Sequence, residues 1–167
     1  MMNDHVKEKF IRGDYQRLYI PEILERVDEL KEESDRVSAM RSNASNALMS
    51  VLFYVFDTQQ IEFDLKPKEV NAIEHLDCSN LKDYDMAELT LSREYKTLSY
   101  LIKDYKKEEK LAFLRRWFDH FHPKETALVK AMFTRSLPQY PSITEKFVRQ
   151  CYPNLLTPIK NSNKKVK

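Results

Sequence analysis

The stretch KEEKLAFLRRWFDHFHPKETALVKAMF, residues 107–133, contains two helical patterns that meet at a proline. In the first pattern, large apolar side chains recur every three or four residues, at Leu111, Leu114, Trp117, Phe118 and Phe121. This spacing places them on one face of an α-helix. The second pattern starts at Pro123, and proline is favoured at the first helical position because its missing N–H has no partner to lose there. The stretch therefore predicts two consecutive helices and favours an all-α fold.

Two histidines lie where these helices meet. His120 and His122 could form an H-x-H metal pair, or Asp119 and His122 could act as an acid–base couple. However, side chains two positions apart on a helix point to different faces, and a metal site needs a third protein ligand. The favoured interpretation is a helix boundary, in which His122 caps the second helix and Glu125 completes a capping box. We therefore expect no catalytic residue and no metal site here.

Most of the remaining chain has the same helical periodicity. Helices are expected within residues 19–30, 34–43, 45–56, 89–105 and 142–152. In 89–105 the predicted buried face consists of Leu91, Tyr95, Leu98, Ile102 and Tyr105. In 142–152, Ser142 and Glu145 have the spacing of a capping box.

One segment has a different period. Ile61, Phe63 and Leu65 alternate with polar residues, which is typical of a short half-buried strand. The sequence therefore predicts a compact, bundle-like all-α domain of six to eight helices, with at most one short β segment near 60–66. The expected organisation is a polar N-terminal extension (1–18), a single helical domain (19–157) and a basic disordered tail (158–167).

Composition excludes several functional classes. The chain has 167 residues, of which 42% are hydrophobic and 32% charged, as in a folded water-soluble domain. Gly13 is its only glycine, so a phosphate-binding glycine loop is absent and no nucleotide cofactor is expected. The longest apolar run, residues 51–56, is too short to span a bilayer, and the N-terminus has no apolar signal segment. These features predict a cytoplasmic protein that has no membrane partner and is not an enzyme.

A basic stripe is the most prominent predicted surface feature. Lys103, Lys106, Lys107 and Lys110 would share one face if a single helix continued through them, and Arg115 and Arg116 extend the basic region. Residues 103–116 contain six basic and three acidic side chains. Tyr100 and Tyr105 lie at the edge of the stripe and could anchor a protein partner.

This stripe allows two kinds of partner. A protein could bind to the lysines and tyrosines together, and this is the favoured hypothesis. Alternatively, nucleic acid could lie along the stripe, helped by four lysines in the C-terminal tail, Lys160, Lys164, Lys165 and Lys167. The modest formal net charge of +2 favours the protein partner.

The segments LSREYKTLSYLIK, FLRRWFDHFHPKETALVKAMFTRSLP and SITEKFVRQCYPNLL resemble a family of small uncharacterised proteins from tailed phages of the T-even type. The family includes relatives in cyanophages and marine phages, and the resemblance covers about residues 17–156. The shared features include the H-P-K-[DE] motif at His122 and a closing P-x-L motif at Pro153, whereas Thr126 departs from the usual alanine. The resemblance implies no catalytic or ligand-binding residues. It implies a phage protein made inside an infected bacterium. Because the sequence has no acid–base or metal cluster, a single glycine and many aromatic residues, we expect an accessory protein that binds a phage or host protein in the cytoplasm of that bacterium.

Overall fold

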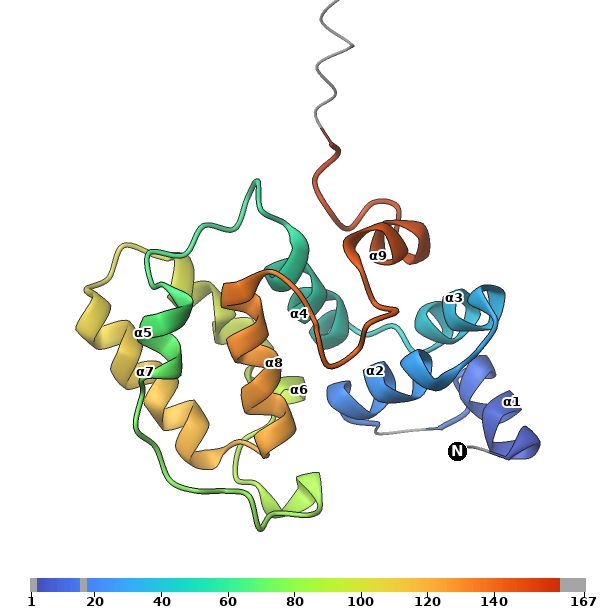
Figure 1. Ribbon diagram of the computed structural model, residues 1–167, viewed down its shortest axis with the longest axis horizontal. Coiled ribbons are helices and arrows are strands. Elements are labelled where there is room, and N and C mark those ends of the chain that lie inside the picture. The colour runs from blue at the N-terminus through green and yellow to red at the C-terminus, as the bar shows by residue number, and fades with distance from the viewer. Residues whose placement is uncertain (1–2, 16–17, 160–167) are drawn as a thin grey trace, which may run out of the picture.

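The computed structural model describes residues 3–15 and 18–159 (Figure 1). Within these ranges the chain forms nine α-helices and two 3₁₀-helices, and no strand. The elements are α1 (Asp4–Arg12), α2 (Ile20–Glu29), α3 (Glu33–Ser42), α4 (Asn46–Phe56), α5 (Pro67–Asn71), η1 (Tyr84–Met86), α6 (Leu91–Glu94), η2 (Tyr95–Ile102), α7 (Lys107–His120), α8 (Pro123–Thr134) and α9 (Glu145–Cys151). The predicted all-α class is confirmed, and α1 and α5 are additions to the expected helices.

Helix α4 lies between two groups of helices. Figure 1 shows α1, α2 and α3 on one side of it and α5, α7 and α8 on the other. Its side chains Leu48, Val51, Leu52 and Val55 are fully buried, and it packs against α8, α6 and η2. A helix with apolar residues on most of its surface belongs at such a central position, because all of its faces can then be covered.

Polar side chains set several helix starts. Ser45 Oγ accepts a hydrogen bond from Leu48 N at 3.0 Å, so the first turn of α4 is capped as its sequence indicates. The expected capping box at Ser142 is wrong, because α9 starts two residues later and Thr144 is its cap. Ser142 instead donates its backbone N–H and its hydroxyl to Asp28 Oδ1 of α2. A partner distant in sequence therefore determines the role of this serine.

The N-terminal segment belongs to the folded domain, so the predicted extension is wrong for residues 4–12. Phe10 is 0% exposed and lies in the hydrophobic core, while α1 packs along α3. Gly13 ends α1 with a φ of 75°, a left-handed conformation that favours glycine. A Cβ atom at this position would overlap the carbonyl oxygen of Ser42, so the only glycine also allows α1 and α3 to approach closely.

The predicted β segment does not form a strand. Ile61 and Leu65 are buried and Glu62 and Asp64 are exposed, so the alternation in burial is present. No strand elsewhere in the described residues offers a hydrogen-bonding ladder, and a single segment cannot form one alone. The backbone is instead held by a side chain, since the Arg135 guanidinium donates to the carbonyl of Ile61.

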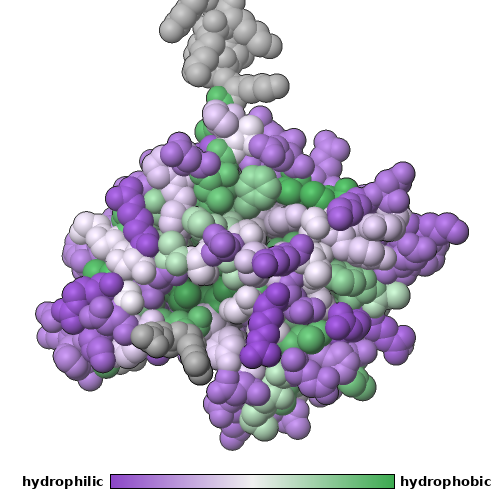
Figure 2. Space-filling model, turned by 180° about the vertical axis from the view of Figure 1, so that it is seen from behind, coloured by the Kyte–Doolittle hydropathy of each residue, from purple (hydrophilic) through white to green (hydrophobic). Residues whose placement is uncertain are grey.

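The predicted tail falls mostly on residues 160–167, which lie outside the described residues. Pro158 and Ile159 are exposed and have no regular structure. On the face seen in Figure 2, hydrophilic side chains cover most of the rim, and hydrophobic ones gather in a band below the grey tail. Over residues 3–15 and 18–159, no helix is both long enough and apolar enough to cross a membrane.

Candidate protein-interaction surface

The segment predicted as one α-helix over 89–105 winds differently. After the single turn of α6, the eight residues Tyr95–Ile102 form the 3₁₀-helix η2. A 3₁₀-helix has three residues per turn, so side chains three positions apart lie on the same face. Leu98 and Leu101 are therefore buried, whereas Ile102 is 37% exposed. The predicted buried face is wrong at Ile102 and Tyr105: the tighter winding turns Ile102 toward solvent, and Tyr105 lies beyond the end of η2.

The predicted basic stripe lacks the continuous helix on which it depended. Lys103 has an extended ψ of 166° and ends η2, and α7 begins only at Lys107. Lys106 is the N-cap residue of α7 and provides no side-chain cap. The predicted single lysine face is therefore wrong. Residues 100–106, here called the corner, comprise the last turn of η2 and the bend that leads into α7.

Lys110 lies inside the protein and cannot contact a partner. It is 3% exposed, and its Nζ lies 2.9 Å from Asp64 Oδ1, in the segment before α5. A buried ammonium group needs such a carboxylate, because an unpaired charge is costly to desolvate. Its assignment as a surface contact is therefore wrong. Lys107, one turn earlier on α7, is exposed and lies 3.6 Å from Glu69.

The other cations of the predicted stripe are exposed but differ in their partners. Arg115 lies 3.9 Å from Asp119, and Arg116 lies 3.8 Å from Glu94. Lys103 and Lys106 have no ion pair with the described residues. Residues 103–109 contain three basic and three acidic side chains, so this stretch of the chain has no formal net charge.

An aromatic row connects the corner with the core. Its rings follow one another in the order Tyr105, Tyr100, Phe113, Trp117 and Phe121. The distances between consecutive ring centroids are 4.4, 4.6, 4.6 and 5.1 Å. Tyr105 is 42% exposed, whereas Trp117 and Phe121 are fully buried. The exposed ring is therefore supported by packed rings beneath it.

The corner concentrates the exposed hydrophobic side chains. Five large hydrophobic residues in the described chain are exposed: Leu76, Met86, Ile102, Tyr105 and Ile159. Two of these lie in the corner, three positions apart. The exposed apolar residues thus cluster at the same place as the two lysines without ion pairs.

The junction between α7 and α8 has the predicted structural role. His122 is buried and caps α8, with its Nδ1 accepting from Lys124 N at 3.1 Å, and Pro123 follows in the first turn. Desolvation lowers the pKa of His122. The predicted capping box is wrong, because the Glu125 carboxylate accepts from Leu91 N instead of the His122 backbone.

The two histidines of the junction have separate partners. His120 Nδ1 lies 3.3 Å from Glu88, whereas the His122 ring stacks on Tyr84 at 4.1 Å. Among residues 3–15 and 18–159, no group of three or more His, Cys, Asp or Glu side chains could hold a metal ion. The arrangement supports helix capping and packing at this junction.

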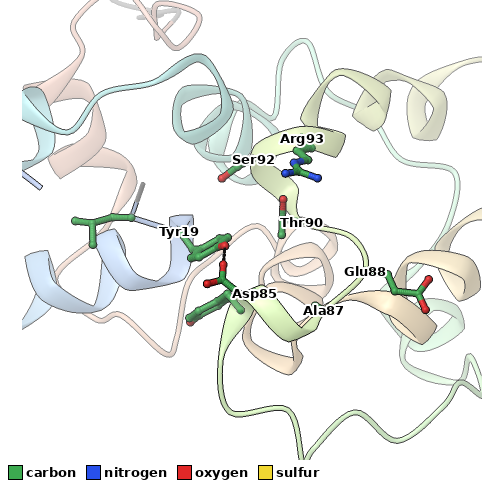
Figure 3. A pocket seen from close by; sticks show the side chains of 9 residues that line it. Tyr19, Asp85, Ala87, Glu88, Thr90, Ser92 and Arg93 are labelled. Atoms are coloured by element: carbon green, nitrogen blue, oxygen red, sulfur yellow. Dashed lines mark hydrogen bonds between the residues drawn. The ribbon is translucent and has the colours of Figure 1, made fainter. Parts of the chain in front are cut away.

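Sequence reasoning missed a cavity of about 630 Å³ between the start of α2, η1 and α6 (Figure 3). Tyr19 and Asp85 point toward each other, and the Tyr19 hydroxyl donates to the carboxylate. Thr90 and Arg93 lie on another side of the cavity, and Glu88 points away from them. No periodic pattern marks residues 84–90, so only their association with Tyr19 could reveal this site.

Comparisons with known proteins add no assignment to this geometry. No family model matches the chain, and neither a curated protein nor a solved structure matches it significantly. The functional conclusion therefore depends on the corner, the cavity and the charges around them.

Proposed function

We propose that this chain is a non-enzymatic accessory protein of a tailed phage that binds a phage or host protein in the cytoplasm of the infected bacterium. One observation carries the proposal: Ile102 and Tyr105, three positions apart in the corner, are both exposed, and the Tyr105 ring packs on Tyr100. Aromatic side chains that are already fixed lose little conformational freedom on binding and dominate many protein interfaces. The corner is therefore the proposed contact surface.

The charges around the corner define the partner further. Lys103 directly follows Ile102 and Lys106 directly follows Tyr105, and neither lysine has an ion pair with the described residues. A partner surface with an apolar centre and carboxylates at its edge would complement this arrangement. We therefore propose a protein partner of that chemistry.

Nucleic-acid binding through residues 103–116 is the alternative, and the charges support it less. Phosphate binding requires several available cations, because affinity comes mainly from the release of counterions. Lys110 is buried, and Lys107, Arg115 and Arg116 each lie near a carboxylate. The four tail lysines lie outside the described residues and make no contribution to this comparison.

The experiment is affinity capture from a phage-infected lysate, with and without nuclease, using matched surface variants. The double variant Ile102→Ser with Tyr105→Ala removes both exposed apolar groups of the corner. Met86→Ser is the control, because Met86 is 62% exposed but lies outside the corner. We expect the wild type and the control to retain a stoichiometric protein partner after nuclease treatment, and the corner variant to lose it.

Two results would contradict the protein-binding proposal. Equal capture by the corner variant would exclude the corner as the contact surface. Loss of all partners after nuclease treatment would support the nucleic-acid alternative. In that case the affinity of purified protein for DNA should fall roughly 10³-fold between 50 and 200 mM salt, whereas an aromatic protein interface should weaken far less.

A further inference from the structure

Glu125 is a buried carboxylic acid with incomplete hydrogen bonding. It lies in the first turn of α8 and is 0% exposed. Its Oε2 accepts from Leu91 N at 3.1 Å, while Oε1 has no partner among the described residues. Burial raises the pKa of Glu125 to about 7, and the hydrogen bond from Leu91 offsets only part of this effect. The group therefore changes its charge close to neutral pH.

The segment 84–91 holds this carboxyl group in its buried environment. The Tyr84 ring lies between Tyr19, at 4.9 Å, and His122, at 4.1 Å. Leu89 N donates to the carbonyl of His120 at 3.2 Å, and Leu91 N donates to Glu125. The Tyr84 hydroxyl is also buried without a hydrogen-bond partner. Two buried polar groups at this contact thus lack partners, which is uncommon in folded proteins.

The neighbouring titratable groups do not neutralise the Glu125 carboxylate. The hydrogen bond to Asp85 raises the pKa of Tyr19, and burial raises that of Tyr84, so both phenols are neutral. Burial lowers the pKa of His122, which favours the neutral ring. Glu22 of α2 accepts from the backbone N–H of Tyr19 and would add negative charge, while Lys124 pairs with Glu25.

Residues of the same segment also line the cavity. Tyr84, Asp85, Thr90 and Ser92 line it, and Figure 3 labels the last three. In the sequence Leu91 lies between Thr90 and Ser92, and its N–H donates to Glu125. A small displacement of the segment would therefore connect the buried carboxyl group with water in the cavity. Water could then hydrogen-bond to the unpartnered Oε1.

We propose that Glu125 is a proton-linked latch for residues 84–91, whose neutral form keeps the segment packed on α8 and whose carboxylate releases it toward the cavity. In the closed state the proton is on Oε1, and Oε2 accepts the Leu91 N–H. Loss of this proton to water leaves a buried negative charge without a cation, which favours the hydrated open state. This latch is independent of the proposed partner-binding function.

The expected size of the effect follows from proton linkage. The pKa of Glu125 is about 7 in the closed state, against an ordinary value of 4.5. If the open state restores the ordinary value, the ratio of open to closed molecules should increase about 70-fold between pH 5 and pH 8.

Amide hydrogen exchange of the full chain tests the latch at the hydrogen bond from Leu91 N to Glu125 Oε2. After correction for the intrinsic pH dependence of exchange, the protection of the Leu91 amide should fall about 70-fold between pH 5 and pH 8. Its protection should remain below that of the Leu52 amide in the centre of α4, because the opening is local. In Glu125→Gln, which has the same shape but does not ionise, the Leu91 protection should not change with pH.

Glu109→Gln is the matched control, since Glu109 occupies the same position of the first turn in α7 but is exposed. This variant should behave like the wild type. Equal protection of Leu91 and Leu52 at every pH would show that no local opening occurs and would overturn the latch. A pH dependence that persists in Glu125→Gln would overturn it too.

A measurement on the wild type covers the case in which Glu125→Gln does not fold. The ¹³C chemical shift of the Glu125 carboxyl group should titrate together with the Leu91 protection, with a midpoint near pH 7. A midpoint below pH 5 would overturn the proposal.

Discussion

Helices α7 and α8 follow each other in the chain, but their N-terminal ends are built differently. At α8, His122 accepts a backbone N–H of the first turn and is itself buried. At α7, Lys106 provides no side-chain cap, and the residues before it form the exposed corner. An end that satisfies its own backbone and is covered by other elements has a structural role. An end that leaves apolar and cationic side chains in water is available to a partner.

The first turns of the two helices also differ in whether a buried ionisable side chain has an ion-pair partner. Lys110 of α7 is paired with Asp64 at 2.9 Å, whereas Glu125 of α8 has one backbone donor and pairs with no cation of residues 3–15 and 18–159. A pair can keep both charges inside a protein, while an unpaired acid tends to become neutral. The contrast explains why we expect pH sensitivity at the start of α8.

The largest expected effect concerns the buried end of the aromatic row. Trp117→Ala should lower the free energy of unfolding by about 3–5 kcal/mol, because it leaves a large cavity in the core. Tyr105→Ala, at the exposed end, should cost less than about 1 kcal/mol. Urea unfolding followed by circular dichroism measures both. Similar decreases in the free energy of unfolding for the two variants would show that Tyr105 belongs to the core. The contrast between a buried and an exposed end of the row would then be wrong.

The next effect is the dependence of stability on pH. The folded pKa of Glu125 is raised to about 7, so its contribution to stability is fully present below pH 4.5 and is lost as pH rises through 7. Between pH 5 and pH 8 the loss should be about 2.5 kcal/mol. Urea unfolding at pH 5 and pH 8 should show this loss in the wild type but not in Glu125→Gln. An equal decrease in the variant would assign the effect to another group.

A smaller effect is expected at the cap of α8. His122→Ala should destabilise the protein by about 1 kcal/mol, since the N–H of Lys124 loses its acceptor. His122→Asn should recover part of this loss, because asparagine is a good N-cap residue. Thermal unfolding of the two variants distinguishes capping from packing on Tyr84: equal destabilisation would indicate that ring stacking is the main contribution.

The smallest effect on stability is expected in the corner. Reversing the charge of both Lys103 and Lys106 to glutamate should change the free energy of unfolding by less than about 0.5 kcal/mol, because both side chains are exposed. The same variant should bind the partner more weakly. A large destabilisation would mean that these lysines support the bend itself.

Local patterns predicted much of the helical structure. The spacing of Leu114, Trp117 and Phe118 identified α7 and its buried face, and Ser45 and His122 marked helix starts. The predictions from local patterns failed where one pattern is compatible with two structures. Leu98 belongs both to an α-helical face with Ile102 and to a 3₁₀ face with Leu101, and burial selected the second.

The sequence by itself determined the all-α class, most helix boundaries and the lack of a glycine-rich phosphate loop, because these depend on local spacing and residue type. Tertiary structure alone decided which cation is buried, which hydrophobic side chains are exposed and which acid is buried with one carboxylate oxygen unpartnered among the described residues. Asp64 lies 46 residues from Lys110, and Leu91 lies 34 residues from Glu125. The free-energy cost of burying a charge depends on such distant partners, and these partners cannot be identified from local sequence spacing.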